Sequence, residues 1–191
     1  NWAAIAAADY VVSWNGSAYA ALDSSNPLTD QVYGLAIHPD GDLYIVGAFS
    51  QFGSTYTYRI ARWDGTQFQT VGAGVNGTVY AVAIDPAGTV FIGGAFTNAG
   101  DDANADRIAA WDGNQFRGLG AGAADGLVYR LAFAPNGDLY ASGTFTAMGG
   151  IGVADHLARW NGSSWSHVDI DLYGSPAVWG LAIGRSDPVI P

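Results

Sequence analysis

The stretch Val79-Tyr80-Ala81-Val82-Ala83-Ile84 decides the fold, because similar stretches return along the chain at intervals of 47 to 50 residues. The other copies occupy residues 32–37, 128–133 and 178–183. A Trp-Asx-Gly triplet follows the same period and starts at Trp14, Trp63, Trp111 and Trp160. A fixed period of this length is typical of an array built from one supersecondary unit.

The unit between residues 79 and 119 predicts four short strands. Asp85-Pro86-Ala87-Gly88 follows the first apolar run, and Asp112-Gly113 separates the last two runs. Pro suits the first corner of a turn, Gly supplies a positive φ, and Asp-Gly is a strong two-residue hairpin signal. We therefore expect an antiparallel meander with strands at residues 79–84, 90–96, 107–111 and 115–119.

Four-stranded meanders at a period of about 40 to 50 residues are the signature of β-propeller blades. Two segments carry a likeness to a known family: Ile60-Ala61-Arg62-Trp63-Asp64-Gly65, followed by Phe68, and Gly93-Gly94-Ala95-Phe96-Thr97. They resemble the kelch-like propeller repeats of bacterial and phage proteins. The resemblance implies an all-β propeller with four-stranded blades of about 48 residues. It implies little about function, because propellers host many activities.

The period predicts a single repeat domain over residues 1–191. Its blades are expected as a split blade with only third and fourth strands at 1–31, complete blades at 32–78, 79–127 and 128–177, and the first strand of a split or incomplete blade at 178–191. Two arrangements stay open. The last strand joins the opening strands and closes a four-bladed ring, or the chain is part of a longer propeller or an oligomeric ring.

The charged residues are 17 Asp and 7 Arg, with neither Glu nor Lys. Glu and Lys usually cover exposed helices, so their absence supports an all-β fold. The net charge of −10 disfavours nucleic acid and anionic membrane surfaces as partners. No apolar run reaches the roughly 18 residues of a membrane span. The absence of Cys excludes disulfides, thiol catalysis and thiolate metal sites.

Antiparallel order places two kinds of connection at opposite ends of each unit. Turns after first and third strands keep a Pro-Asx-Gly or Asx-Gly character, whereas loops after second and fourth strands differ between units. Rigid folds commonly carry binding sites on such loops. We call the end that these loops form the variable face. Its segments are residues 1–8, 50–57, 97–105 and 146–154 after second strands, and residues 23–31, 72–78, 120–127 and 169–176 after fourth strands.

The variable face carries aromatic and acidic side chains outside the repeat pattern. Aromatic rings there can stack on sugars or anchor a protein partner, or else cap the core. Close carboxylates can hold Ca²⁺, but no EF-hand spacing appears, so we expect solvated acids with no metal or other cofactor. The candidate partner-binding residues are Trp2, Phe52, Tyr56, Asp101, Asp102, Asp169, Asp171 and Tyr173.

No catalytic constellation stands out in the sequence. The three histidines lack metal-ligand spacing, and neither a G-x-S-x-G elbow nor a P-loop lysine is present. The sequence therefore predicts a non-catalytic extracellular or cell- or virion-surface module that binds a protein or glycan without membrane insertion. The first alternative is a structural subunit of a phage tail or surface filament. The second is a glycan-active enzyme, which would need converging carboxylates such as Asp101 and Asp169.

Overall fold

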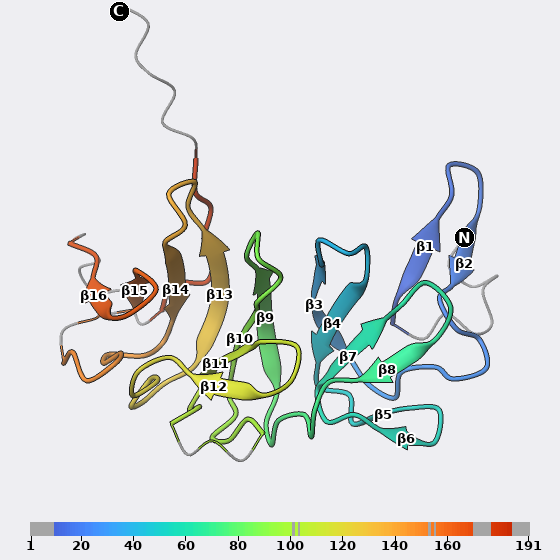
Figure 1. The fold of residues 1–191 in the computed structure, drawn as a ribbon, viewed down its shortest axis with the longest axis horizontal. Helices are drawn as coiled ribbons and strands as arrows, with labels where there is room; N and C mark the ends of the chain where they lie inside the picture. The colour runs from blue at the N-terminus through green and yellow to red at the C-terminus, as the bar shows by residue number, and fades with distance from the viewer. Residues whose placement is uncertain are drawn as a thin grey trace, which may run out of the picture.

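The computed structural model describes residues 10–100, 102, 104–152, 154, 156–169 and 177–184. These residues form antiparallel β-sheets and contain no helix, which confirms the predicted all-β class (Figure 1). None of the described residues therefore belongs to a helix that is long and apolar enough to cross a membrane. The strands are β1 (Val12–Trp14), β2 (Tyr19–Ala21), β3 (Val32–Ile37), β4 (Leu43–Gly47), β5 (Gln51–Phe52), β6 (Thr55–Tyr56), β7 (Ile60–Trp63), β8 (Phe68–Thr70), β9 (Val79–Ile84), β10 (Val90–Gly94), β11 (Ile108–Trp111), β12 (Phe116–Gly118), β13 (Val128–Phe133), β14 (Leu139–Gly143), β15 (Leu157–Trp160) and β16 (Trp165–His167).

Three sheets have four strands each, and each follows the predicted meander. The first sheet has the order β3-β4-β7-β8, the second contains β9 to β12, and the third contains β13 to β16. A short hairpin, β5-β6, extends the first sheet's loop after β4, and the pair β1-β2 precedes the first sheet. In Figure 1 the sheets stand in a row, with β1-β2 at one end and the third sheet at the other.

The predicted two-residue hairpin at Asp112-Gly113 is wrong in length. Trp111 pairs with Phe116, so residues 112–115 form the loop. The cause is the carboxylate of Asp112, whose Oδ1 accepts the backbone N–H groups of Asn114 and Gln115 at 2.9 Å each. Such an Asx turn satisfies two backbone donors that a two-residue hairpin would pair across the ladder.

A glycine ends the second strand of each four-stranded sheet for a steric reason. A Cβ at these positions would lie 1.9 to 2.2 Å from the carbonyl oxygen of the residue that precedes the sheet's first strand. The residue after each glycine donates its N–H to that same carbonyl at 2.8 to 3.0 Å. Only glycine therefore allows the two backbones to approach closely enough for this bond. The glycine and carbonyl pairs are Gly47 with Gln31, Gly94 with Thr78, and Gly143 with Leu127.

Neighbouring sheets bury a common core. One cluster joins Tyr44 and Val46 of the first sheet to Ile92 and Trp111 of the second. A second cluster joins Phe91 of the second sheet to β14, β15 and β16 of the third, and a third cluster joins Val11 and Leu22 of the N-terminal segment to the first sheet. Trp111 is 8% exposed, so this third-strand tryptophan is buried in the core between the first and second sheets.

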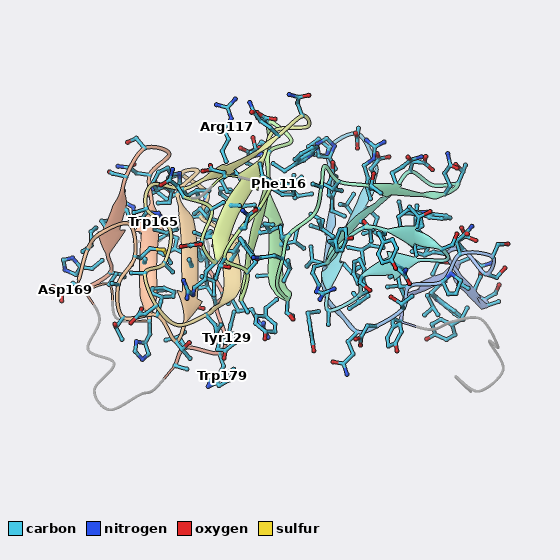
Figure 2. All side chains as sticks on the ribbon, turned by 90° about the horizontal axis from the view of Figure 1, so that it is seen from below. Phe116, Arg117, Tyr129, Trp165, Asp169 and Trp179 are labelled. Carbon is cyan, nitrogen blue, oxygen red and sulfur yellow. The ribbon has the colours of Figure 1, made fainter. Side chains whose placement is uncertain are left out.

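The inner strands β3, β9 and β13 are neighbours, and one aromatic position of each forms a continuous row. The ring centroids of Tyr33 and Tyr80 are 5.4 Å apart, those of Tyr80 and Tyr129 are 5.4 Å apart, and those of Tyr129 and Trp179 are 4.4 Å apart. Figure 2 shows Tyr129 and Trp179 together on the lower side of the molecule in that view. These separations are within the range in which aromatic rings attract one another.

The strand predicted at residues 178–183 is not a strand in the structure. The segment still lies against the third sheet, because the N–H of Val178 donates to the carbonyl of Gly143 at 3.0 Å and Trp179 stacks on Tyr129. Among the described residues no second strand flanks the segment, so it lacks a ladder partner on its other side. The N-terminal pair β1-β2 and the third sheet stand at opposite ends of the row, and the segment does not join β1-β2.

Candidate binding face

The variable face is built from loops that pair with one another. The loops after β2, β8 and β12 each form an isolated antiparallel bridge with the loop after the second strand of the next sheet. The first residue of each bridge occupies the same position of the 47 to 50 residue repeat, and both residues of every bridge are buried. The bridged pairs are Leu28 with Phe52, Val75 with Ala99, and Ala123 with Met148.

A side-chain oxygen fixes each of these loop pairs. Asn76 Oδ1 accepts the N–H groups of Thr97 and Asn98 at 2.9 and 3.1 Å. Asp125 Oδ1 does the same for Thr146 and Ala147 at 2.8 and 3.3 Å. The hydroxyl of Thr29 takes this place in the first sheet, where it accepts the N–H groups of Ser50 and Gln51 at 3.4 and 3.2 Å. We call these three residues the loop clamps.

The carboxylate of Asp125 is the charged member of the loop clamps. The hydroxyl of Thr146 donates to its Oδ2 at 2.5 Å, and this bond is the largest influence on the group. Together with the backbone N–H groups of Thr146 and Ala147 it holds the pKa of Asp125 below its ordinary value. Asn76 performs the same clamping without a charge, so the variable face tolerates different chemistry at one geometric position.

The predicted aromatic residues separate into a buried one and an exposed one. Phe52 is 8% exposed and packs on Phe68 with ring centroids 5.5 Å apart, so it caps the core beneath the face. Tyr56 is 59% exposed, and its ring stacks on that of Tyr58 at 5.6 Å and 20°. Trp2 and Tyr173 lie outside the described residues.

The predicted acidic residues do not form a cluster in the described part of the chain. Asp102 is a structural acceptor: it takes the N–H groups of Asn104 at 2.9 Å and Gly118 at 2.8 Å, which lower its pKa in that order. Asp169 is exposed and lies at the far end of the third sheet (Figure 2). Asp101 and Asp171 lie outside the described residues. Within the described ranges, no three His, Asp, Glu or Cys side chains gather closely enough to hold a metal ion.

A hollow of the face lies beside the exposed tyrosine pair. Its volume is about 420 Å³. It lies where residues 58–59, just before β7, meet the loop that contains residues 73–76 and the loop that contains residues 98–100. Its volume falls in the range of small-molecule sites, roughly 300 to 1,000 Å³. We call it the Tyr58 pocket, and its lining consists of Tyr58, Arg59, Ala73, Gly74, Val75, Asn76, Asn98 and Gly100.

Backbone geometry builds the Tyr58 pocket. Tyr58 and Arg59 have φ values of 46° and 77°, which turn the chain sharply before β7. Gly74 lets the neighbouring loop approach this turn, because a Cβ there would lie 2.6 Å from the carbonyl oxygen of Thr57. The N–H of Val75 then donates to the carbonyl of Tyr58 at 3.0 Å. Arg107 and His156, the residues before β11 and β15, have positive φ values of 62° and 66°, so the conformation of Arg59 belongs to the repeat. The positive φ of Tyr58 has no counterpart among the described residues of those turns, and it is strained for a residue with a side chain.

Arg59, the arginine of the pocket, makes few hydrogen bonds within the protein. Its Nη1 donates to the carbonyl of Phe49 at 3.3 Å, while its buried Nε has no hydrogen-bond partner among the described residues. At the equivalent turn of the second sheet, Arg107 Nη1 donates to the carbonyl of Ala123 at 2.9 Å. A guanidinium carries five N–H donors, and because Nε is buried, the Nη groups of Arg59 are the ones left to meet a ligand oxygen.

Sequence reasoning missed Tyr58 and Arg59. The signal available to it was the segment Tyr56-Thr57-Tyr58-Arg59, whose two tyrosines have no counterpart at residues 104–107 or 153–156. A second hollow, of about 360 Å³, is lined mainly by polar residues, among them Asp23, Asn26 and Thr55, together with Phe52 and Phe68.

Comparison with known proteins assigns no family. No family model matches the chain, and no curated protein matches it. The chain is similar to a solved structure of the extracellular domain of a one-component system from B. thetaiotaomicron, with a TM-score of 0.49 and 14% identity over 78% of this chain. The chain spans 18% of the length of that structure. A similarity of this size carries no argument about function.

Proposed function

We propose that the chain is a non-catalytic surface module that binds a glycan at the Tyr58 pocket. The observation that carries the proposal is a pocket of about 420 Å³ next to a stacked, exposed tyrosine pair. Aromatic rings give a sugar ring an apolar surface on which to pack, and the amide and guanidinium groups of the lining can bind its hydroxyl groups. The spare donors of Arg59 favour a sugar that carries a carboxylate, because guanidinium groups bind carboxylates with two parallel hydrogen bonds.

The wider context of the proposal is a kelch-like β-propeller whose blades are the observed sheets. The 47 to 50 residue period, the meander order of each sheet and the row of inner strands support it. We place the module outside the cell or on a cell or virion surface, where a glycan partner would be met. The net charge of −10 agrees with a partner that is not nucleic acid.

The test is binding to a glycan library that contains neutral sugars and sugars with carboxylates. Tyr56→Ala and Tyr58→Ala each remove one ring of the stacked pair, and we expect each to weaken binding at least about tenfold, as loss of an anchor residue does. Tyr19→Ala is the matched control, because Tyr19 is 48% exposed and lies on β2, away from the pocket. Unchanged affinity of both pocket variants would exclude the Tyr58 pocket as the binding site.

The preference for an acidic sugar has its own test. Arg59→Lys keeps a positive charge but removes the planar pair of donors. We expect this variant to lose affinity for sugars with carboxylates while its affinity for neutral sugars changes little. Equal losses for both kinds of sugar would show that Arg59 supports the shape of the turn and does not select the ligand.

A further inference from the structure

One face of β3 is apolar and open. Leu35 is 52% exposed and Ile37 is 74% exposed, and both side chains point to the same side of the strand. Tyr33, at the register shift near the start of β3, is 46% exposed. Large apolar side chains in a contiguous group of this kind mark an interaction surface. We call these three residues the β3 face.

The same positions on the other inner strands are covered by the preceding sheet. Val82 and Ile84 of β9 pack against the core that contains Tyr44 and Val46 of the first sheet. Leu131 and Phe133 of β13 pack in the same way against the core that contains Phe91 of the second sheet. The structure therefore shows twice what covers such a face: the inner part of a neighbouring sheet of the same repeat.

A glycine on the neighbouring inner strand makes this packing fit. A Cβ at Gly34 would lie 3.2 Å from Cγ1 of Val82, so the absence of a side chain at Gly34 leaves room for the large residue of the next strand. In the second contact the equivalent small residues of β9 are Ala81 and Ala83, so both contacts join a face of large residues to a face of small ones. The repeat places Leu35 at the position of Val82 and Gly180 at the position of Gly34.

The small-residue face at the other end of the row is also open. Gly180 has no atom of the described residues within 4 Å of the place where a Cβ would stand, and Ala182 is exposed. The alternate residues Leu181 and Ile183 are partly buried, so the small side faces away from the third sheet. Residues 180 and 182 therefore present the small-residue complement of the β3 face.

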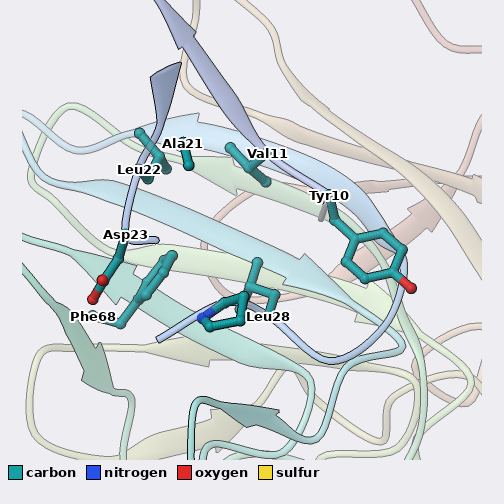
Figure 3. A pocket seen from close by; sticks show the side chains of 8 residues that line it. Tyr10, Val11, Ala21, Leu22, Asp23, Leu28 and Phe68 are labelled. Atoms are coloured by element: carbon teal, nitrogen blue, oxygen red, sulfur yellow. The ribbon is translucent and has the colours of Figure 1, made fainter. Parts of the chain in front are cut away.

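The outer part of the β3 side is already sealed. Val11 and Leu22 pack on the first sheet, and the space left beside them measures about 10 Å³, no more than one water-sized site (Figure 3). Only the inner strand of that side lacks a neighbour among the described residues. A partner that supplies one inner strand with small residues completes on β3 the same contact that β9 makes with the first sheet and β13 makes with the second.

We propose that a second copy of this chain supplies that strand, in a head-to-tail contact. Leu35 of one copy packs on Gly180 of the other as Val82 packs on Gly34, and Tyr33 extends the aromatic row beyond Trp179. A second copy fits better than the chain's own segment, because residues 177–184 lie against the third sheet and the second sheet stands between them and β3 (Figure 1). The contact is heterologous, so it builds a ring or a filament.

Disulfide trapping between two single variants tests the contact, since the chain contains no Cys. Leu35→Cys is mixed with Gly180→Cys and oxidised, and the products are separated by mass. We expect a disulfide-linked dimer from the mixture well above the amount that either variant forms alone. Gly152→Cys is the matched control partner for Leu35→Cys, because Gly152 also has open space around it. Equal dimer yields with Gly152→Cys and Gly180→Cys would overturn the proposal.

The variant that carries both cysteines separates the second copy from the chain itself. Linked oligomers are expected if the contact forms between copies. A monomer with an internal disulfide would overturn the proposal and would show that the chain closes on itself. Neither outcome depends on glycan binding, so this test and that of the Tyr58 pocket fail independently.

Association without a crosslink gives a second measurement. Leu35→Asp and Gly180→Val change positions that are open in the single chain, so both variants are expected to fold, as checked by circular dichroism. Sedimentation velocity should show concentration-dependent oligomers for the unmodified chain, with at least a tenfold weaker association for either variant. Added salt should strengthen association, because two copies of net charge −10 repel each other. An unmodified chain that stays monomeric at every concentration would contradict the proposal.

Discussion

The two ends of each sheet hold their loops in different ways. At the turn end, Asx side chains bind backbone N–H groups two or three residues away: Asp64 accepts the N–H groups of Thr66 and Gln67, and Asn161 accepts those of Ser163 and Ser164, all at 2.9 Å. At the variable face, the loop clamps bind N–H groups 21 or 22 residues away.

This difference explains why one end repeats and the other varies. A local turn needs the same few residues each time, because its donors and acceptor lie in one short segment. A clamp needs only an oxygen at a fixed place, and Thr29, Asn76 and Asp125 all supply one. The loops between clamped points are therefore free to differ, and the Tyr58 pocket arises in one such difference.

The largest expected effect is that of Gly94→Ala at the variable end of the second sheet. Its Cβ would stand 2.2 Å from the carbonyl oxygen of Thr78, so one of the two backbones must move. We expect a loss of about 3 kcal/mol in the free energy of unfolding, as for a severe overpacking change, measured by urea denaturation.

Gly113→Ala is the control at the turn end. Gly113 has a φ of 95°, and no described atom lies within 4 Å of the place where its Cβ would stand, so only backbone strain opposes the change. We expect Gly113→Ala to lower the free energy of unfolding by about 1 kcal/mol. Equal losses for the two variants would contradict the view that the close approach of two backbones distinguishes the variable end.

A smaller effect is expected from an ion pair at the turn end that the middle sheet lacks. Arg159 Nε lies 2.7 Å from Oδ2 of Asp138, and Arg62 pairs with Asp42 in the same way at 3.3 Å. The second sheet has Thr89 and Ala110 at these positions. Arg159→Ala removes the positive charge that pairs with the buried Asp138 carboxylate. We expect the free energy of unfolding to fall by about 1 kcal/mol.

The double variant Asp138→Thr, Arg159→Ala copies the pair that the second sheet already uses. It should be more stable than Arg159→Ala alone, because the uncompensated carboxylate is gone. Thermal unfolding of the two single variants and the double variant measures this coupling. Additive losses would show that the ion pair contributes nothing to the turn end.

The smallest effect concerns the charged clamp. Because the folded chain lowers the pKa of Asp125, its stabilisation is fully present above the unfolded pKa of about 3.9 and is lost as the pH falls through the folded pKa. Asp125→Asn keeps an oxygen acceptor, as Asn76 does, but removes this pH dependence. We expect a loss of about 0.5 kcal/mol near pH 7, after allowing for solvent screening, and almost none at pH 2.

The measurement is urea denaturation of both proteins from pH 2 to pH 7. The two stability curves should converge as the pH falls below about 4. A difference that stays constant over this range would show that the carboxylate clamps the loops through its shape alone and that its charge contributes nothing.

The sheets could be predicted from the sequence because their rules are local. Runs of alternating apolar residues, Asx-Gly turns and the period placed the strands of the second sheet, of which β9 matches its expected bounds and the other three differ from theirs by one or two residues at an end. The segment at residues 178–183 has the same pattern as β3 but is not a strand, since strand formation also needs a partner strand to complete the ladder.

The candidate site was less accessible to sequence reasoning. Phe52 and Tyr56 are both aromatic residues in one loop, and nothing local distinguishes the one that meets Leu28 in the core from the one that faces solvent. The turn at Tyr58 and Arg59 depends on Gly74, which lies 15 residues from Arg59 and on another loop. The alternation of ion pairs between sheets was visible in the sequence, as Asp42 with Arg62 and Asp138 with Arg159, beside Thr89 with Ala110.

The loop clamps also have a consequence for how the chain acquires its structure. Each clamp joins a loop to a segment only 21 or 22 residues further along, with the first two strands of one sheet between them. Closing a loop of this length carries a small entropic penalty, so a clamped pair of strands can form soon after its last residue is available. During synthesis the array can therefore fold from its N-terminus, one clamp at a time, with each finished sheet offering the next its apolar side.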